Sequence, residues 1–134
     1  MPLVLLAVDG HPHSKKIADA AIEVAKAMSA KILLCFVITE AAPEGYHGDD
    51  FNKDEFDRAV GGIADRIRAA KVECEELWGA GDPKKLIVKT AELRKATMIV
   101  IGMHPLHNVG KIRALGDVSR SVVENSKVPV LVIP

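Results

Sequence analysis

The chain has 134 residues, 49% of them hydrophobic and 27% charged, which suits one globular domain with a single sizeable core. Lys and Arg total 18, as do Asp and Glu, so the formal net charge is zero. This balance removes the electrostatic argument for nonspecific binding to nucleic acid or to anionic membranes. The aromatic residues, three Phe, one Trp and one Tyr, are too few for a base-stacking platform.

The sequence also bears on compartment and cysteine chemistry. The apolar run at residues 3–8 is too short for a signal core and has neither a basic flank nor a cleavage site. No apolar run approaches the ~20 residues of a membrane span, so we expect a cytoplasmic protein. Cys35 and Cys74 lie in predicted strands among apolar neighbours and lack metal or redox spacing, which favours two reduced, buried thiols.

The first part of the chain reads as strand, helix, strand. Residues 3–8 (LVLLAV) and 32–38 are continuous apolar runs, typical of strands buried on both faces. Between them, Ser14 is a plausible N-cap for a helix that extends to about Met28. Apolar residues recur there at steps of three and four and predict one buried stripe: Ile17, Ala20, Ala21, Val24, Ala25 and Met28.

A polar connection at residues 39–50 then leads to a second helix and a third strand. The connection is a candidate for a lid-like loop. Residues 50–70 have a helical apolar pattern, although Gly61-Gly62 lowers the helix propensity. Residues 72–77 alternate apolar and acidic side chains, which places this strand at an edge of the sheet with one wet face.

Two further helix–strand units close the chain. Gly79 and Gly81 predict a turn, and Asp82-Pro83 gives a strong helix start, because Asp caps and Pro loses no needed N–H. We expect this helix to extend to about Lys95. Its expected buried set is Leu86, Ile87, Ala91 and Leu93, or Leu86, Thr90 and Leu93. Residues 98–101 and 128–133 predict strands on either side of a helix at 117–125.

The alternation of strands and helices forces parallel pairing with right-handed crossovers. The most apolar strands, the first, second and fourth, belong at the centre, and the acidic third belongs at an edge. We therefore predict an α/β fold: a single five-stranded, doubly wound, flavodoxin-like parallel sheet in the order 3-2-1-4-5. Its ligand crevice should lie between strands one and four, where helix N-termini favour anions.

Several polar residues fall on the loops expected at this crevice. His11, His13, His104 and His107 follow strands one and four, and they indicate either a transition-metal site or exposed histidines that titrate between about pH 5 and 8. Asp9 is either a ligand-binding carboxylate or a cap for the following loop. Ser119 and Ser121 lack the strand–Gly-x-Ser-x-Gly–helix setting of a nucleophile, and Trp78 favours packing or an interface.

Four segments together resemble a known family: the first strand with its terminal Asp9, the Gly79–Pro83 turn, ATMIVIGMH at residues 96–104, and VVENSKVPVLVIP at the end. The chain resembles a universal stress protein domain over residues 1–134. The resemblance implies the same sheet, grouped with adenine nucleotide alpha hydrolase-like folds, and a homodimer that pairs through Val128–Ile133. It also implies ATP or AMP as a ligand and assigns no catalytic residue.

The resemblance further implies which residues form the nucleotide crevice. Ala7, Val8, Asp9 and Val37 match the positions that hold adenosine. ATP-binding members carry Gly, two residues, Gly, nine residues, and then Gly before Ser or Thr. Here Gly102 matches the first glycine, Pro105 replaces the second, and Gly116 comes one residue late, before Asp117. The full set is Ala7, Val8, Asp9, Val37, Gly102, Met103, His104, Gly116, Asp117 and Val118.

These departures weaken the phosphate site. Pro105 has no N–H to donate and a fixed φ. The Asp117 carboxylate at ~4 Å from a phosphate costs about 4 kcal/mol at an effective dielectric of 20, unless Lys111, Arg113 or a cation offsets it. We expect weak or absent ATP binding, with a divalent cation only if a nucleotide binds. The alternatives are slow metal-dependent hydrolysis or phosphotransfer through Asp9 and Asp117, without a P-loop, and a protein-interaction module.

Overall fold

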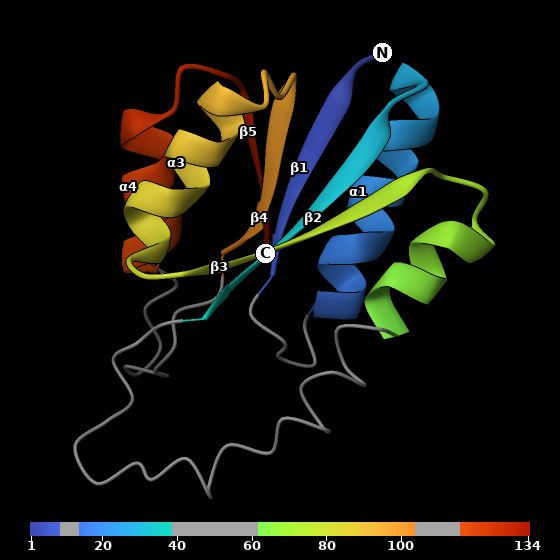
Figure 1. Cartoon of the computed structure of the whole chain (residues 1–134), viewed down its shortest axis with the longest axis horizontal. Coiled ribbons are helices and arrows are strands. Elements are labelled where there is room, and N and C mark those ends of the chain that lie inside the picture. The colour runs from blue at the N-terminus through green and yellow to red at the C-terminus, as the bar shows by residue number, and fades with distance from the viewer. Residues whose placement is uncertain (9–13, 39–61, 104–115) are drawn as a thin grey trace, which may run out of the picture.

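The computed structural model describes residues 1–8, 14–38, 62–103 and 116–134. Within them a five-stranded sheet has the order β3-β2-β1-β4-β5, and every neighbouring pair is parallel (Figure 1). This confirms the predicted fold class and strand order. The strands are β1 (Leu3–Val8), β2 (Lys31–Ile38), β3 (Cys74–Ala80), β4 (Met98–Gly102) and β5 (Val130–Ile133).

Helices cover both faces of the sheet. They are α1 (Ser14–Met28), α3 (Pro83–Leu93) and α4 (Asp117–Asn125), and residues 62–69 are helical as well. Figure 1 shows α1 and residues 62–69 on one face and α3 and α4 on the other. A bidentate ion pair joins α1 to the helix at residues 62–69: Arg66 Nε and Nη2 donate to Asp19 Oδ1 and Oδ2 at 2.6 and 2.8 Å. The earlier part of the predicted second helix and the connection at 39–50 lie outside the described residues.

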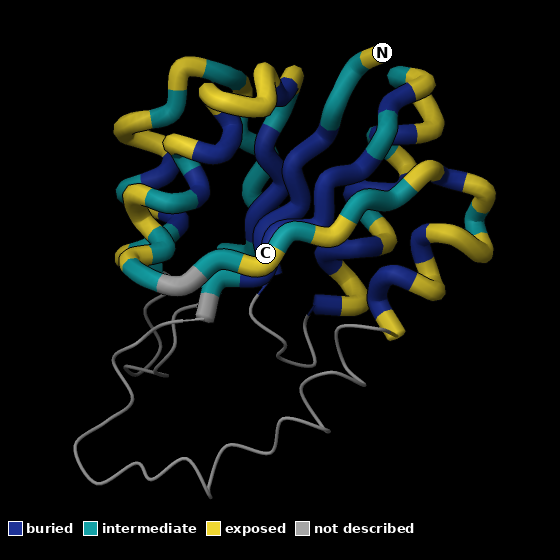
Figure 2. The backbone as a smooth tube through the Cα atoms, in the orientation of Figure 1, coloured by how far each residue is buried: buried dark blue, intermediate teal, exposed yellow. Residues whose placement is uncertain are grey.

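The central strands are buried on both faces, as their continuous apolar runs predict (Figure 2). Successive side chains of a strand alternate between faces and so divide the core in two. Val4, Leu6 and Phe36 belong to the core under α1 and residues 62–69. Leu5 and Leu33 belong to the core under α3 and α4.

The buried stripes of two helices differ from the prediction. In α1 the apolar residues that are fully buried are Ile17, Ala18, Ala21, Ile22 and Ala25. Ala20, Val24 and Met28 are only half-buried, because the helix contacts the sheet through a face rotated toward Ala18 and Ile22. In α3 the buried residues are Ile87, Thr90 and Ala91. Leu93 is 71% exposed and Leu86 half-buried; Leu93 follows Ala91 by two positions, which places it on the opposite side of a helix.

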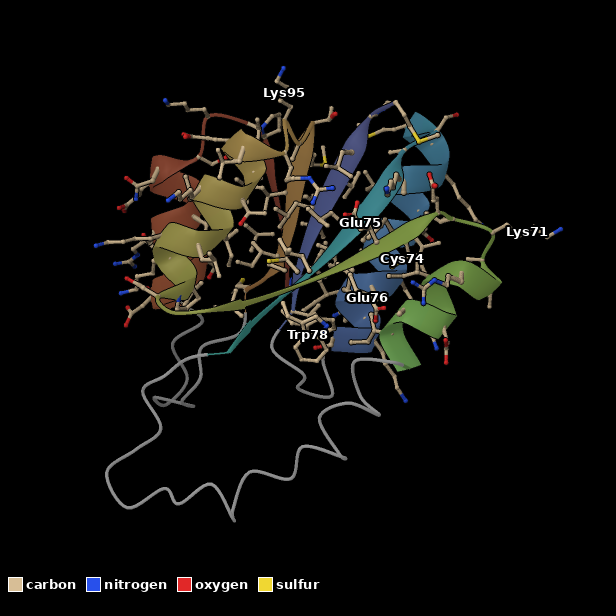
Figure 3. All side chains as sticks on the ribbon, viewed as in Figure 1. Lys71, Cys74, Glu75, Glu76, Trp78 and Lys95 are labelled. Carbon is tan, nitrogen blue, oxygen red and sulfur yellow. The ribbon has the colours of Figure 1, made fainter. Side chains whose placement is uncertain are left out.

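Strand β3 lies at an edge of the sheet, as predicted, but it begins two residues later and ends three residues later than the expected 72–77. Gly79 is therefore part of the strand, and Gly81 makes the turn with φ of 132°. Trp78, labelled on β3 in Figure 3, stacks on Phe36 of β2 with the ring centroids 5.1 Å apart. The pairing of β3 with β2 continues beyond these two residues to Ala80 and Ile38. This contact bears out the packing interpretation of Trp78.

The acidic residues of β3 are held by neighbouring cations. Glu75 Oε2 lies 2.6 Å from Arg94 Nη2 and 3.0 Å from Lys31 Nζ. Hydrogen bonds from Arg94 and then Lys31 lower the pKa of the Glu75 carboxyl. The edge strand therefore keeps its charges and a wet face, a feature that discourages edge-to-edge aggregation.

The start of α3 is capped as the sequence predicts. Asp82 has an extended backbone, its Oδ1 accepts from the Lys84 N–H at 3.0 Å, and Pro83 occupies the first helical position. We predict that Asp82→Ala lowers the free energy of unfolding by about 1 kcal/mol, because one N–H of the first turn loses its acceptor. Urea denaturation measures this change. Asp65→Ala, at an exposed position of the helix at 62–69, is the control and should change stability by less than about 0.5 kcal/mol. Equal losses in the two variants would contradict the capping role.

Candidate functional site

The sheet has a switch point between β1 and β4, where successive connections leave toward opposite faces. After β1 the chain continues to α1 on one face, and after β4 it continues to α4 on the other. Open α/β sheets bind ligands at this position, outside the carboxyl ends of the strands. Ala7, near the end of β1, pairs with Ile101 on β4 and with Cys35 on β2, so the carboxyl ends of the central strands are neighbours.

The described residues expected to hold adenosine lie at the ends of β1 and β2. Ala7 is 6% exposed and belongs to the core under α3 and α4, whereas Val8 is 7% exposed and belongs to the opposite core. Val37, on β2, is half-buried against the same core as Ala7. Because the Ala7 and Val8 side chains are committed to packing, these two residues offer a ligand mainly their backbone. Asp9 lies outside the described residues.

Hydrogen bonds bring the start of α4 to the end of β4. The Met103 N–H donates to the Ile133 carbonyl at 2.8 Å, and the Gly116 N–H donates to the Met103 carbonyl at 3.4 Å. Gly102, directly before Met103, ends β4 and pairs with Ile133. The structure thus brings together Gly102, Met103 and Gly116, although twelve residues separate Met103 from Gly116 in the sequence. These twelve, which include His104 and Pro105, are outside the described residues.

The N–H groups in the first turn of α4 receive no side-chain cap but lie beside a carboxylate. Gly116 is the N-cap with an extended backbone and supplies no side-chain cap. Asp117, exposed in the first turn, places a carboxylate where the helix dipole favours negative charge. Val118 is half-buried, and Ser119 is buried with its hydroxyl donating to the Gly116 carbonyl at 3.1 Å. Ser119 is therefore a packing residue, as predicted, and the acidic charge at this helix start is the Asp117 carboxylate.

The two thiols of the chain lack the lowered pKa of a nucleophilic cysteine. Cys35 is fully buried, and burial raises its pKa to about 11. Cys74 is half-buried rather than buried, because it lies on an edge strand, and partial burial raises its pKa as well. Both are free cysteines that stay protonated near neutral pH. The predicted histidine group lies outside the described residues: His11, His13, His104 and His107. Among the residues that the structure does describe, no three His, Cys, Asp or Glu side chains are grouped so as to hold a metal ion.

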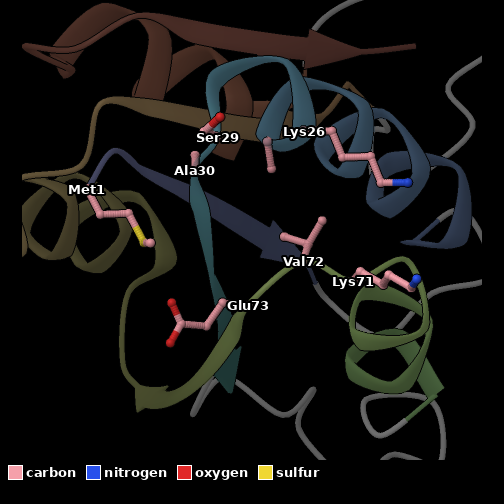
Figure 4. A pocket seen from close by; sticks show the side chains of 8 residues that line it. Met1, Lys26, Ser29, Ala30, Lys71, Val72 and Glu73 are labelled. Carbon is pink, nitrogen blue, oxygen red and sulfur yellow. The ribbon is translucent and has the colours of Figure 1, made fainter.

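An open hollow of about 360 Å³ lies near the amino ends of the strands, beside the start of β2 (Figure 4). Its polar side chains do not converge, since the labelled Lys26 and Lys71 point away from Glu73 in Figure 4. It is therefore a surface depression remote from the switch point. Its lining residues are Met1, Ala25, Lys26, Ser29, Ala30, Lys71, Val72 and Glu73.

A parallel sheet of this order, with a helix N-terminus hydrogen-bonded to the end of β4, defines a flavodoxin-like α/β protein. The family model described as the universal stress protein family matches residues 2–134, and the chain belongs to that family. A Thermus aquaticus relative, named "Universal stress protein in QAH/OAS sulfhydrylase 3′ region", is 32% identical over 139 residues, which cover 97% of this chain and 96% of the relative.

Solved structures of the family have the same fold. A universal stress protein from Archaeoglobus fulgidus superposes with a TM-score of 0.78 at 23% identity, covering 100% of this chain and 98% of that one. A universal stress protein solved in complex with cAMP has a TM-score of 0.73 at 28% identity, covering 99% and 97% of the two chains. Within the described part of this chain, no helix has the length and apolarity needed to cross a membrane.

Proposed function

We propose that this universal stress protein is a cytoplasmic regulatory protein without catalytic activity that binds an adenine nucleotide of low charge, such as AMP or cAMP, at the switch point. In this proposal ATP binds weakly or not at all. The observation that carries it is the exposed Asp117 carboxylate in the first turn of α4, a helix whose start is hydrogen-bonded to the end of β4. The cAMP complex of a relative that is 28% identical supports an adenine nucleotide as the ligand class.

The adenosine part would lie against the carboxyl ends of β1 and β2. Ala7 and Val8 would contribute backbone groups, and the half-buried Val37 an apolar contact. Asp9, directly after Val8, would accept hydrogen bonds from ribose hydroxyls, a role that suits a carboxylate at a strand end. The side near β4 and α4 would be formed by Gly102, Met103, His104, Gly116, Asp117 and Val118.

Charge sets the preference among nucleotides. Each phosphate that approaches the start of α4 meets a carboxylate as well as the helix dipole. Repulsion between unit charges a few ångströms apart amounts to several kcal/mol at an effective dielectric of 20, and water and salt reduce it at an exposed group such as Asp117. A triphosphate bears this cost more than once, whereas AMP or cAMP keeps its charge small. A divalent cation would enter only with a polyphosphate.

We also propose a homodimer that pairs through Val128–Ile133. In the described sheet β5 is an edge strand, and its four residues, Val130 to Ile133, are apolar and only half-buried. An apolar edge strand left open is an aggregation liability, and a symmetric copy is the simplest cover. The Pro129 carbonyl accepts from Ile99 on β4 and the Ile133 carbonyl from Met103, directly after β4, so the backbone groups of Val132 face away from β4.

The first prediction concerns the nucleotide. Isothermal titration calorimetry should show that AMP or cAMP binds more tightly than ATP in the absence of Mg²⁺, because the lower charge is repelled less by Asp117. GMP is the control for base recognition and should bind more weakly. Tight ATP binding without a metal, or no heat from any adenine nucleotide, would contradict the proposal.

The second prediction concerns the carboxylate. Asp117→Ser should raise ATP affinity by roughly tenfold, because it removes a negative charge and leaves a hydroxyl at the helix start. Asp117→Glu keeps the charge and serves as the control, with ATP affinity close to that of the unaltered protein. The same two variants should change AMP affinity less. Equal ATP affinity in Asp117→Ser and Asp117→Glu would show that the carboxylate does not govern selectivity.

The third prediction concerns assembly. Val132→Pro removes an N–H that faces away from β4, so the sheet should stay intact while pairing with a second copy is lost. Light scattering after size exclusion should report a monomer for Val132→Pro and a dimer for Val132→Thr, which retains the N–H. A dimeric Val132→Pro would place the interface elsewhere.

A further inference from the structure

The first residue of α1, Ser14, carries a buried hydroxyl without a partner. Ser14 is 2% exposed, and its Oγ is the only buried side-chain N or O atom in the described part of the chain that makes no hydrogen bond. Buried polar atoms in folded proteins are almost always hydrogen-bonded, so this exception calls for an explanation, such as a bound ion or water. The hydroxyl can both donate and accept, which suits an oxyanion or its water shell.

The position of Ser14 in the helix indicates the direction of this hydroxyl. Cα–Cβ bonds in an α-helix tilt toward its N-terminus, so the side chain of a first residue is directed past the amino end of the helix. The N–H groups of the first turn, which have no acceptor within the helix, point the same way. α1 has 15 residues, so its N-terminal N–H groups carry the full dipole. Together they form a set of donors suited to an anion.

The charges of the first turn support the same conclusion. Lys15 and Lys16 follow Ser14, both are exposed, and no acidic residue occurs in this turn. Two cations at a helix N-terminus are repelled by its partial positive charge when no anion is bound. When an anion is bound there, the cations and the helix dipole both attract it. The start of α4 differs, with the acidic Asp117 at its first position and the exposed Arg120 at its fourth.

Both helix starts lie at the carboxyl edge of the sheet. α1 follows β1 after five residues, α4 is hydrogen-bonded to the end of β4, and β1 and β4 are adjacent (Figure 1). The two helices cover opposite faces, so they flank the switch point from its two sides. We propose that the phosphate of the nucleotide binds the first turn of α1, through the Ser14 hydroxyl, the free N–H groups and the Lys15 and Lys16 charges, rather than the first turn of α4. This inference rests on the proposed function only for the nucleoside part of the ligand.

The test uses inorganic phosphate first, because it probes the anion site without the adenine. Titration of the ¹⁵N-labelled full chain should shift the amide signals of residues 14–16 saturably, at constant ionic strength kept with chloride. Ser14→Ala should weaken this binding about tenfold, the ordinary loss for one hydrogen bond to a charged ligand. Without phosphate its melting temperature should equal or exceed that of the unaltered protein, because the hydroxyl has no partner to lose.

A second variant keeps the test decisive if Ser14→Ala fails to fold. The double change Lys15→Gln and Lys16→Gln should weaken phosphate binding and flatten its salt dependence. Lys26→Gln, in the last turn of α1, is the matched control and should leave both unchanged. A drop in melting temperature of phosphate-free Ser14→Ala would show a capping role and overturn the inference. So would phosphate shifts confined to residues 117–119, or shifts that chloride reproduces.

AMP and adenosine then separate this inference from the proposed function. The proposed function predicts that AMP binds, and only the inference predicts that Ser14→Ala removes most of the affinity that AMP has beyond that of adenosine. If phosphate binds residues 14–16 but no adenine compound binds, the anion site stands and the proposed function fails. If AMP binds equally well to Ser14→Ala and to the unaltered protein, the proposed function stands and the inference fails.

Discussion

Burial of three strands on both faces is the constraint from which the rest of the structure follows. β1, β2 and β4 have helices above and below them, and residues such as Leu5, Leu6 and Val100 are inaccessible to water. Strands that are buried on both faces lie inside a sheet covered by two helical layers. The edges are taken by β3, which contains acidic residues, and by the half-buried β5. It also sends the chain to opposite faces after β1 and β4, so two helix starts flank one point of the edge.

The character of the candidate site then depends on which charges those helix starts carry. The backbone contributes the same partial positive charge to each N-terminus. The side chains break the equivalence, because Asp117 partly cancels the dipole of α4, whereas Lys15 and Lys16 add to that of α1. In the proposed site, one sheet edge would combine a position that disfavours phosphate with another that favours it.

Much of the fold is predictable from the sequence because its strongest signals are one-dimensional. The apolar run of residues 3–8 and the Asp82-Pro83 helix start specify a buried strand and a capped helix, and the structure contains both. Other features depend on geometry that hydropathy does not record. Ala18 and Ala20 are the same residue type, yet only Ala18 is buried, since the crossing of α1 over the sheet decides which one faces inward.

The candidate site is predictable to a smaller extent. Sequence pattern places Gly102 and Gly116 near one another only through the expected topology, and the hydrogen bond from Gly116 to Met103 is a tertiary feature. Ser14 was visible in the sequence as a helix N-cap, whereas the absence of any partner for its hydroxyl emerges only from coordinates. Sequence reasoning placed the candidate site at the carboxyl edge of the sheet and the anion on the α4 side, whereas the inference drawn from Ser14 places the anion on the α1 side.

The stack of Trp78 on Phe36 has a practical consequence for spectroscopy. The chain contains a single tryptophan, so its tryptophan emission arises from one place on β3. Phe36 directly precedes Val37, and Trp78 is 43% exposed, so the indole reports on both solvent and the carboxyl end of β2. The protein thus contains its own optical reporter a short distance from the region where a ligand is expected, and emission changes can be followed without attaching a dye.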